Sequence, residues 1–185
     1  GFRAAGVCEA FAPQTHDFYA SWVEAGMGDG MPYLRSSLEL RRSLDSVFPG
    51  TRSVLVVALD YNQPPSRPSS EGRIARYALG RDYHKVIRSK LRQLAGELLP
   101  PGSWRVCVDS APVLEREFAQ RAGIGWFGKN TCLIDSARGS WFVVGLLLTT
   151  LELAPDRAAT GGCGTCTRCI EACPTGAIVQ HEGRW

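Results

Sequence analysis

Residues 52–61 read RSVLVVALDY, an apolar run rich in β-branched side chains. A continuous run of this kind predicts a buried strand, because alternation is lost when both faces of a strand are covered. Residues 140–150, SWFVVGLLLTT, have the same character and predict a second buried strand after a turn at 137–139. Trp104 to Val108 predicts a third strand. These strands lie between helical patterns, so the sequence predicts a mixed fold of helices and strands.

Helical periodicity appears in the segments between the strands. A helix is predicted from Asp82 to the stop at Pro100-Pro101-Gly102, and another over VLEREFAQRAG at 113–123, closed by Gly123. The pattern that starts at Phe18 gives way to a loop, GMGDGMPYL, at 26–34. The opening GFRAAGVCEAF resembles the inside of a helix and the strand after it, and NQPPSRPSSEG at 62–72 predicts a loop able to move over a site.

Length and composition limit the possible classes. The chain has 185 residues, 44% of them hydrophobic, which is enough for one core and a small second module. Its longest apolar run, 141–148, is far shorter than the roughly 20 residues of a membrane-spanning helix. No export signal opens the chain. A cytoplasmic protein without a membrane partner is expected, whose natural N- and C-termini both lie outside these residues.

Arginines give the middle of the chain a basic character, within a net charge of +3. The guanidinium group suits phosphate because its planar fork makes paired hydrogen bonds. A solvated helix face and a nucleic-acid footprint both remain open, because no long run of charge is present. The residues concerned are Arg41, Arg42, Arg73, Arg76, Arg81, Arg88 and Arg92.

A cysteine-dense tail follows a shift in composition near Leu153. Four cysteines have the spacing C-x2-C-x2-C-x3-C-P, which is typical of iron–sulfur ligands in bacterial ferredoxins. Zinc and disulfide frameworks are the alternatives, and the spacing and the absence of an export signal disfavour them. In two-cluster proteins the fourth cysteine serves the other cluster, so further ligands are expected beyond residue 185. The four are Cys163, Cys166, Cys169 and Cys173, whereas Cys8, Cys107 and Cys132 are expected to be buried apolar residues.

Asp109 follows the strand at 104–108 and precedes Ser110-Ala111-Pro112. Its simplest role is to cap the helix that follows. A carboxyl group at the end of a strand can also hold a proton for general acid catalysis above a crevice. The two roles are compatible, and the residues alone leave both open.

Several motifs occur together in one order: ARYALGRDYHKVIRSKL, VDSAPVLEREFAQRAGIGWFGKNTCLI, GSWFVVGLLLTTLEL and CGTCTRCIEACPTGAI. In this order and spacing the chain resembles the epoxyqueuosine reductases over nearly its whole length. The resemblance implies an α+β fold, in which residues 1–153 form a nitroreductase-like cobalamin-binding core and residues 154–185 begin a ferredoxin-like 4Fe-4S module. The relatives of this family include the reductive dehalogenases.

The resemblance also implies a function. The family reduces epoxyqueuosine to queuosine at the wobble position of tRNA, with cobalamin and two 4Fe-4S clusters. The expected partners are tRNA carrying epoxyqueuosine and an electron donor such as a flavodoxin or ferredoxin, and the protein is expected to be a monomer. The alternatives are a dehalogenase-like reductase of a small molecule and a ferredoxin-type electron carrier, which would bind no corrinoid.

Site residues follow from the matching motifs. Asp109 matches the proposed proton donor of the family. The resemblance places the loop around Lys129, Asn130 and Thr131 beside the corrinoid. The other cofactor contacts that it implies are Arg35, Tyr83, His84, Asp109, Ser140 and Trp141. Ala75 stands in a region where some relatives carry a cysteine, so no thiolate from this segment is expected on cobalt.

Overall fold

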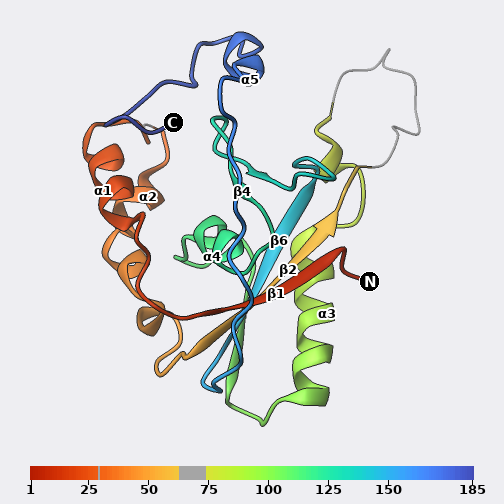
Figure 1. Ribbon diagram of the computed structural model, residues 1–185. Helices are drawn as coiled ribbons and strands as arrows, with labels where there is room; N and C mark the ends of the chain where they lie inside the picture. The colour runs from red at the N-terminus through yellow and green to blue at the C-terminus, as the bar shows by residue number, and fades with distance from the viewer. Residues whose placement is uncertain (29, 63–73) are drawn as a thin grey trace.

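A four-stranded antiparallel sheet forms the centre of the protein, in a computed structural model that describes residues 1–28, 30–62 and 74–185. The strand order is β1-β2-β6-β3 (Figure 1). The strands are β1 (Ala4–Glu9), β2 (Ser53–Asp60), β6 (Phe142–Thr149) and β3 (Trp104–Cys107). The three strands predicted from apolar runs are therefore confirmed, as is the mixed fold. Most of the predicted loop at 62–72, together with Arg73, lies outside the described residues.

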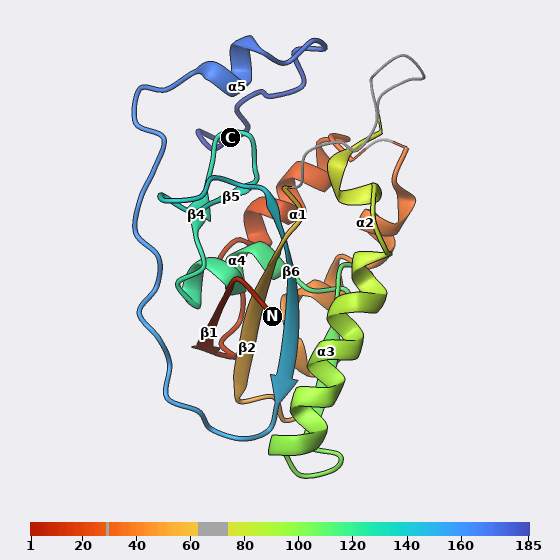
Figure 2. The ribbon, with the colours of Figure 1, turned by 90° about the vertical axis from the view of Figure 1, so that its right-hand side faces the viewer.

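Helices cover both faces of this sheet. The helix α3 (Tyr83–Leu98) packs on one face and α4 (Glu115–Arg121) on the other (Figures 1 and 2). Side chains of β2 alternate between the two sides, since Val56 joins the core cluster of Phe118 in α4 while Val57 joins that of Ile87 in α3. Burial on both sides explains why β2 has no polar alternation.

Gly145 lets α3 lie close against the sheet. A methyl group at Gly145 of β6 would meet Cγ2 of Ile87 at 2.3 Å and Cδ1 of Leu91 at 3.4 Å. Both side chains are fully buried, so neither has free space to move into. The first residues of α3 are thereby held at the edge of the site described below.

The remaining elements are short. They are α1 (His16–Glu24), α2 (Pro32–Ser36), the 3-10 turns Glu39–Arg42, Leu44–Ser46 and Arg76–Ala78, the paired β4 (Trp126–Phe127) and β5 (Leu133–Ile134), and α5 (Arg168–Glu171). The prediction of a loop throughout 26–34 was wrong, because α2 begins at Pro32, whose fixed φ suits a first helical position. Residues 1–3 form no helix.

The segment 152–163 runs without regular structure along the outside of the sheet towards α5 (Figure 2). Its backbone is nevertheless attached to the core. Val7 of the edge strand β1 donates to Oδ2 of Asp156 at 2.8 Å, and the amide of Asp156 donates back to the Val7 carbonyl at 2.9 Å. The amide of Ala159 donates to the carbonyl of Gln120 at 2.8 Å. This segment therefore leads the chain to the cysteines along a path set by the core.

No helix among the described residues is both long and apolar enough to cross a membrane.

Candidate functional site

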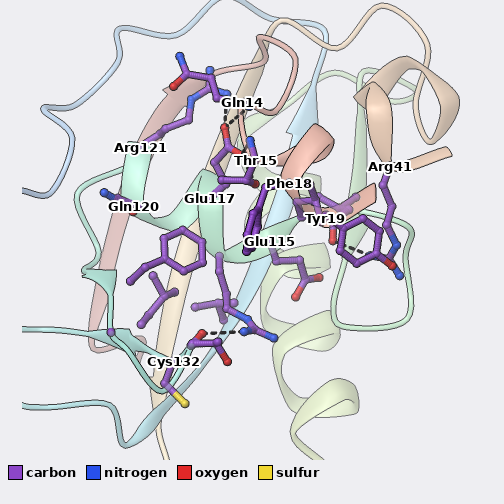
Figure 3. A pocket seen from close by; sticks show the side chains of 18 of the residues that line it. Gln14, Thr15, Phe18, Tyr19, Arg41, Glu115, Glu117, Gln120, Arg121 and Cys132 are labelled. Carbon is purple, nitrogen blue, oxygen red and sulfur yellow. Dashed lines mark hydrogen bonds and ion pairs between the residues drawn. The ribbon is translucent and has the colours of Figure 1, made fainter. Parts of the chain in front are cut away.

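A cavity of about 1680 Å³ lies between α1, α2, α4, the beginning of β6 and the C-terminal residues. Figure 3 shows side chains that line it, including Tyr19, Arg41 and Glu115. The volume exceeds the roughly 300–1,000 Å³ of ordinary small-molecule pockets, so this central cavity has room for a large ligand. The predicted catalytic, cofactor-binding and metal-binding residues that line it are Tyr83, Asp109, Lys129, Thr131, Ser140 and Cys163.

Asp109 has an unusual backbone conformation in the loop between β3 and α4. Its φ is 59°, a value that costs energy in a residue with a side chain. The amide of Ser110 donates to the carbonyl of Val108 at 2.7 Å, so Asp109 is the central residue of a γ-turn of the rare, strained form. Thr131, which also lines the cavity, has a φ of 61°. Strain of this kind concentrates at functional sites.

The predicted capping role of Asp109 was wrong. The helix α4 begins at Glu115, with Leu114 at the N-cap position and no side-chain cap. The relationship is reversed, since Oε1 of Glu115 accepts from the amide of Asp109 at 2.8 Å. The carboxyl group of Asp109 is therefore free for other partners.

Two side chains from the start of α3 bind the carboxylate of Asp109. The hydroxyl of Tyr83 donates to Oδ2 at 3.2 Å, and Nε2 of His84 lies 3.0 Å from the same oxygen. Nδ1 of His84 lies 2.8 Å from Oδ1 of Asp82, the residue that also caps α3. Carboxylates only accept hydrogen bonds, so an imidazole that bonds to both of them carries protons on both nitrogens. Asp82, His84 and Asp109 thus form a chain from the surface to the cavity.

The pKa shifts agree with this arrangement. The hydrogen bond to Asp109, more than that to Asp82, raises the pKa of His84 above its ordinary value. Burial, and after it the charge of Asp109, raises the pKa of Tyr83 to about 12. The Tyr83 hydroxyl is therefore protonated at physiological pH and remains a donor. The rings of Tyr83 and His84 stack with centroids 3.9 Å apart, which fixes both side chains together.

The side chain of Lys129 reaches from the cavity wall to the cysteine tail. Its Nζ donates to the carbonyl oxygens of Gly164 and Cys166 at 2.9 and 3.0 Å. Its backbone amide lies 3.5 Å from Sγ of Cys163. Asn130 is turned inward on its own loop, where Oδ1 accepts from the amide of Cys132 at 3.2 Å. The loop at 128–132 thus connects the cavity wall to the tail.

Of three further predicted cofactor contacts, Ser140 lies at the cavity, whereas Arg35 and Trp141 do not line it. Arg35 on α2 donates to the carbonyl of Val23 at 3.2 Å and is absent from the cavity lining. Ser140 lines the cavity. Trp141 is exposed, with the guanidinium of Arg76 4.8 Å above its ring. Another arginine of the basic stretch, Arg88, bonds to the carbonyl of Val108 and the hydroxyl of Ser110.

The four cysteines of the tail are free thiols around α5. Cys163 lines the cavity, and hydrogen bonding, first from the Thr175 hydroxyl, lowers the pKa of Cys173 to about 7. A thiolate is the form that binds metal. Among the described residues no three Cys, His, Asp or Glu side chains are grouped closely enough to hold a metal ion. The donors suit iron–sulfur ligation by their chemistry, and the loop would have to close around a cluster.

The other cysteines divide into two kinds. Cys8 and Cys107 are buried as predicted, and burial raises the pKa of each thiol to about 11. The prediction for Cys132 was wrong, because this residue is exposed and lines the cavity. It precedes β5, which is only two residues long, so no long strand buries it.

Two acidic residues of the site were missed by sequence reasoning. Glu117 in α4 is buried, and its carboxylate accepts from the amides of Gln14 and Thr15 and from the Thr15 hydroxyl (Figure 3). It thus anchors the beginning of α1. Glu115 lines the cavity and holds the amide of Asp109. The only signal in the sequence was an acidic first turn, which is ordinary in helices.

Comparisons with known proteins extend over the whole chain. A family model described as "Epoxyqueuosine reductase QueG, DUF1730" matches residues 41–110. The epoxyqueuosine reductase of Gloeobacter violaceus is 44% identical over 97% of this chain, and that of Xanthomonas campestris is 42% identical over 97%. The chain belongs to the epoxyqueuosine reductase family. It covers 58% and 53% of these two relatives, so it spans a little over half of their length.

Solved structures of the epoxyqueuosine reductase family share the fold. The enzyme from Streptococcus thermophilus has a TM-score of 0.86 at 29% identity, covering 97% of this chain and 50% of that one. A family structure with a tRNA-Tyr epoxyqueuosine-modified stem loop has a TM-score of 0.81 at 29% identity, covering 100% and 51%. A catabolic reductive dehalogenase, at 19% identity and a TM-score of 0.51, shares the fold alone, over 86% of this chain and 19% of its own.

Proposed function

We propose that this chain is the catalytic part of an enzyme that reduces epoxyqueuosine to queuosine at the wobble position of tRNA. The observation that carries the proposal is the carboxyl group of Asp109, which lies at the cavity with two proton-carrying partners in a chain of this family. A relative has been solved with an epoxyqueuosine-modified tRNA stem loop, which supports tRNA as the substrate. Cytoplasmic location and a monomeric state stay predictions.

The two modules are part of the proposal. Residues 1–153 would form the nitroreductase-like core that holds cobalamin, and residues 154–185 would begin the ferredoxin-like module. The size of the central cavity supports a large planar cofactor, with Ser140 and Thr131 among the polar groups of its wall. Cys163, Cys166 and Cys169 would hold one 4Fe-4S cluster, and Cys173 would ligate a second. Because Cys163 lines the cavity, the first cluster would lie at its wall.

The reaction sets the demands on the protein. Converting an epoxide to an alkene breaks both carbon–oxygen bonds, releases the oxygen as water, and consumes two electrons and two protons. A reduced corrinoid, when bound, supplies the electrons, which the clusters deliver one at a time from an external donor such as a flavodoxin or ferredoxin. The side chains of this chain must therefore bind the substrate and supply protons.

Asp109 suits the role of proton donor to the leaving oxygen. Tyr83 and His84 both bond to Oδ2, and among the residues that the structure describes no hydrogen bond reaches Oδ1. Oδ1 is therefore the oxygen available to a substrate in the cavity. The reactive form would carry a proton on Oδ1, while Oδ2 still accepts from Tyr83 and His84. After Oδ1 has given this proton to the leaving oxygen, the imidazolium of His84 can pass a proton to Oδ2 over 3.0 Å, and His84 is reprotonated beside Asp82 at the surface. A family structure from Bacillus subtilis shows a catalytic aspartate loop swung out of the active site, which supports a catalytic role for an aspartate on a loop.

Nucleoside mass spectrometry on tRNA tests the proposal. The full-length protein, loaded with clusters, is incubated anaerobically with epoxyqueuosine-containing tRNA and a strong reductant, with and without cobalamin. Queuosine is expected only when cobalamin is present. If no queuosine forms although cluster absorbance is intact, the proposed function is wrong.

A further inference from the structure

The carboxyl group of Glu115 has no part in the proton transfer described above, yet it lines the same cavity as Asp109. Its Oε1 accepts from the amide of Asp109 at 2.8 Å, across the loop that joins β3 to α4. A hydrogen bond to a carboxylate is stronger than one to a neutral acceptor. Glu115 therefore binds the peptide group whose orientation sets the direction of the Asp109 side chain.

The conformation that Glu115 holds is one the chain would otherwise leave. Asp109 has a φ of 59° within a strained γ-turn, and relaxation to negative φ would turn its amide and its side chain elsewhere. The neighbouring part of the turn is fixed from the other side, since Arg88 of α3 donates to the Val108 carbonyl and the Ser110 hydroxyl. Glu115, the first residue of α4, fixes the turn from the opposite side by accepting from the Asp109 amide.

A carboxyl group at this position is costly in free energy, because its ionised form is buried. Burial, and with it the charge of Asp109, raises the pKa of Glu115 to about 7, while the amide of Asp109 and the charges of Arg116 and Arg41 act in the opposite direction. The charge of Glu115 in turn contributes to the raised pKa values of Tyr83 and Cys107. The Glu115 carboxyl group is therefore ionised to a smaller extent near neutral pH than an ordinary glutamate. A residue needed only for packing at the start of a helix would avoid this cost.

We infer that Glu115 is a positioning residue that holds the Asp109 peptide in its left-handed conformation, so that the carboxylate faces Tyr83 and His84. This role rests on the proposed function of Asp109 as proton donor. It nevertheless has a signature in the protein alone. We call the hydrogen bond from the Asp109 amide to Oε1 of Glu115 the clamp. The contact between Asp109 and His84 is the first cause of the raised His84 pKa, so losing the clamp lowers that pKa.

The test compares three versions of the full-length protein: wild type, Glu115→Ala and Glu115→Gln. His84 is titrated by NMR on ¹⁵N-histidine-labelled protein without RNA, and its signal is assigned with His84→Gln. The His84 pKa is expected to fall in the order wild type, Gln, Ala, because the amide oxygen of Gln still accepts while Ala cannot. Turnover on modified tRNA should fall about tenfold in Glu115→Ala, with KM for tRNA unchanged. Glu97→Gln, at an exposed carboxylate of α3, is the matched control.

Two outcomes overturn the clamp. One is a wild-type His84 titration in Glu115→Ala, and the other is an equal pKa in the Gln and Ala variants. If the alanine variant does not fold, Glu115→Asp takes its place, because its shorter side chain keeps the charge but cannot reach the amide. If wild-type protein forms no queuosine while the His84 pKa falls as expected, the clamp stands and the proposed function is the part that is wrong.

Discussion

Nε2 of His84 lies 3.0 Å from Oδ2 of Asp109, although one residue is in the first turn of α3 and the other follows β3. The sheet brings the two together, because α3 packs across β6 and β3 pairs with β6. The same histidine bonds to Asp82 through its other nitrogen. A carboxyl group at the cavity is thereby linked to the surface through a single imidazole.

Asp109→Asn is expected to lower turnover by at least about a hundredfold, since general acid catalysis contributes roughly 10²–10⁴-fold. The amide keeps the size of the side chain, so cobalamin binding should be unchanged. Turnover is measured from queuosine formed, and binding from the corrinoid spectrum. Asp17→Asn, at an exposed residue of α1, should behave as wild type. Full activity in Asp109→Asn would remove the proton-donor role.

His84 should make stability depend on pH. The folded state raises the pKa of His84, so the protonated ring stabilises the protein below its unfolded pKa of about 6.5, and this contribution is lost as pH rises through the raised pKa. His84→Gln should therefore lower the free energy of unfolding at about pH 5.5 and change it little at about pH 9. Denaturant unfolding of the full-length protein at both values measures the difference. An equal loss at both would show that the charge of the ring is not involved.

Lys129→Met should loosen the cysteine tail. The methionine keeps much of the side-chain volume but cannot donate to the carbonyls of Gly164 and Cys166. Iron should pass to a chelator about tenfold faster, because a hydrogen bond from a charged group contributes roughly 1.5–3 kcal/mol, reduced here by solvent. The cluster midpoint potential should also fall, since a nearby positive charge favours the reduced form. Lys90→Met, at an exposed residue of α3, should change neither quantity.

Gly145→Ala should destabilise the core by about 1–3 kcal/mol, because the new methyl group would overlap Ile87. Gly96→Ala is the matched control. Gly96 lies on α3 with nothing within 4 Å of an added methyl group, so alanine there should stabilise the helix by about 0.5–1 kcal/mol. Thermal unfolding of both variants shows whether each substitution raises or lowers the stability of the protein. Stabilisation by Gly145→Ala would contradict the close approach of α3 to β6.

Long elements could be predicted because each carries its own pattern. β2 and β6 are continuous apolar runs, and α3 has apolar residues at helical spacing with a capping aspartate. Of the two shortest strands, β5 at Leu133–Ile134 lies in the apolar stretch TCLID, which predicts a short strand, and is confirmed. β4 could not be predicted, since its two residues lie in a glycine-rich stretch. The capping role expected of Asp109 was wrong because the local pattern does not fix where the helix begins. A sequence DSAP before a helical pattern indicates a cap, but the helix starts only at Glu115.

The candidate site was predictable in its chemistry and not in its contacts. The cysteine spacing and the motif around Asp109 identified groups that can bind metal or hold a proton. That Lys129 reaches the carbonyls of the tail depends on how distant segments pack, as does the exposure of Cys132. No local pattern encodes such contacts.

The reciprocal bonds between Val7 and Asp156 affect how the molecule meets its neighbours. A strand at the border of a sheet offers unpaired amides and carbonyls to any other extended chain, which is a common route to aggregation. Here the segment 152–163, which leads to the cysteines, lies along that border. The carboxylate of Asp156 accepts from the Val7 amide, and the Asp156 amide donates to the Val7 carbonyl. The same stretch of chain that leads to the cysteines thus also keeps another strand from pairing with β1 at Val7.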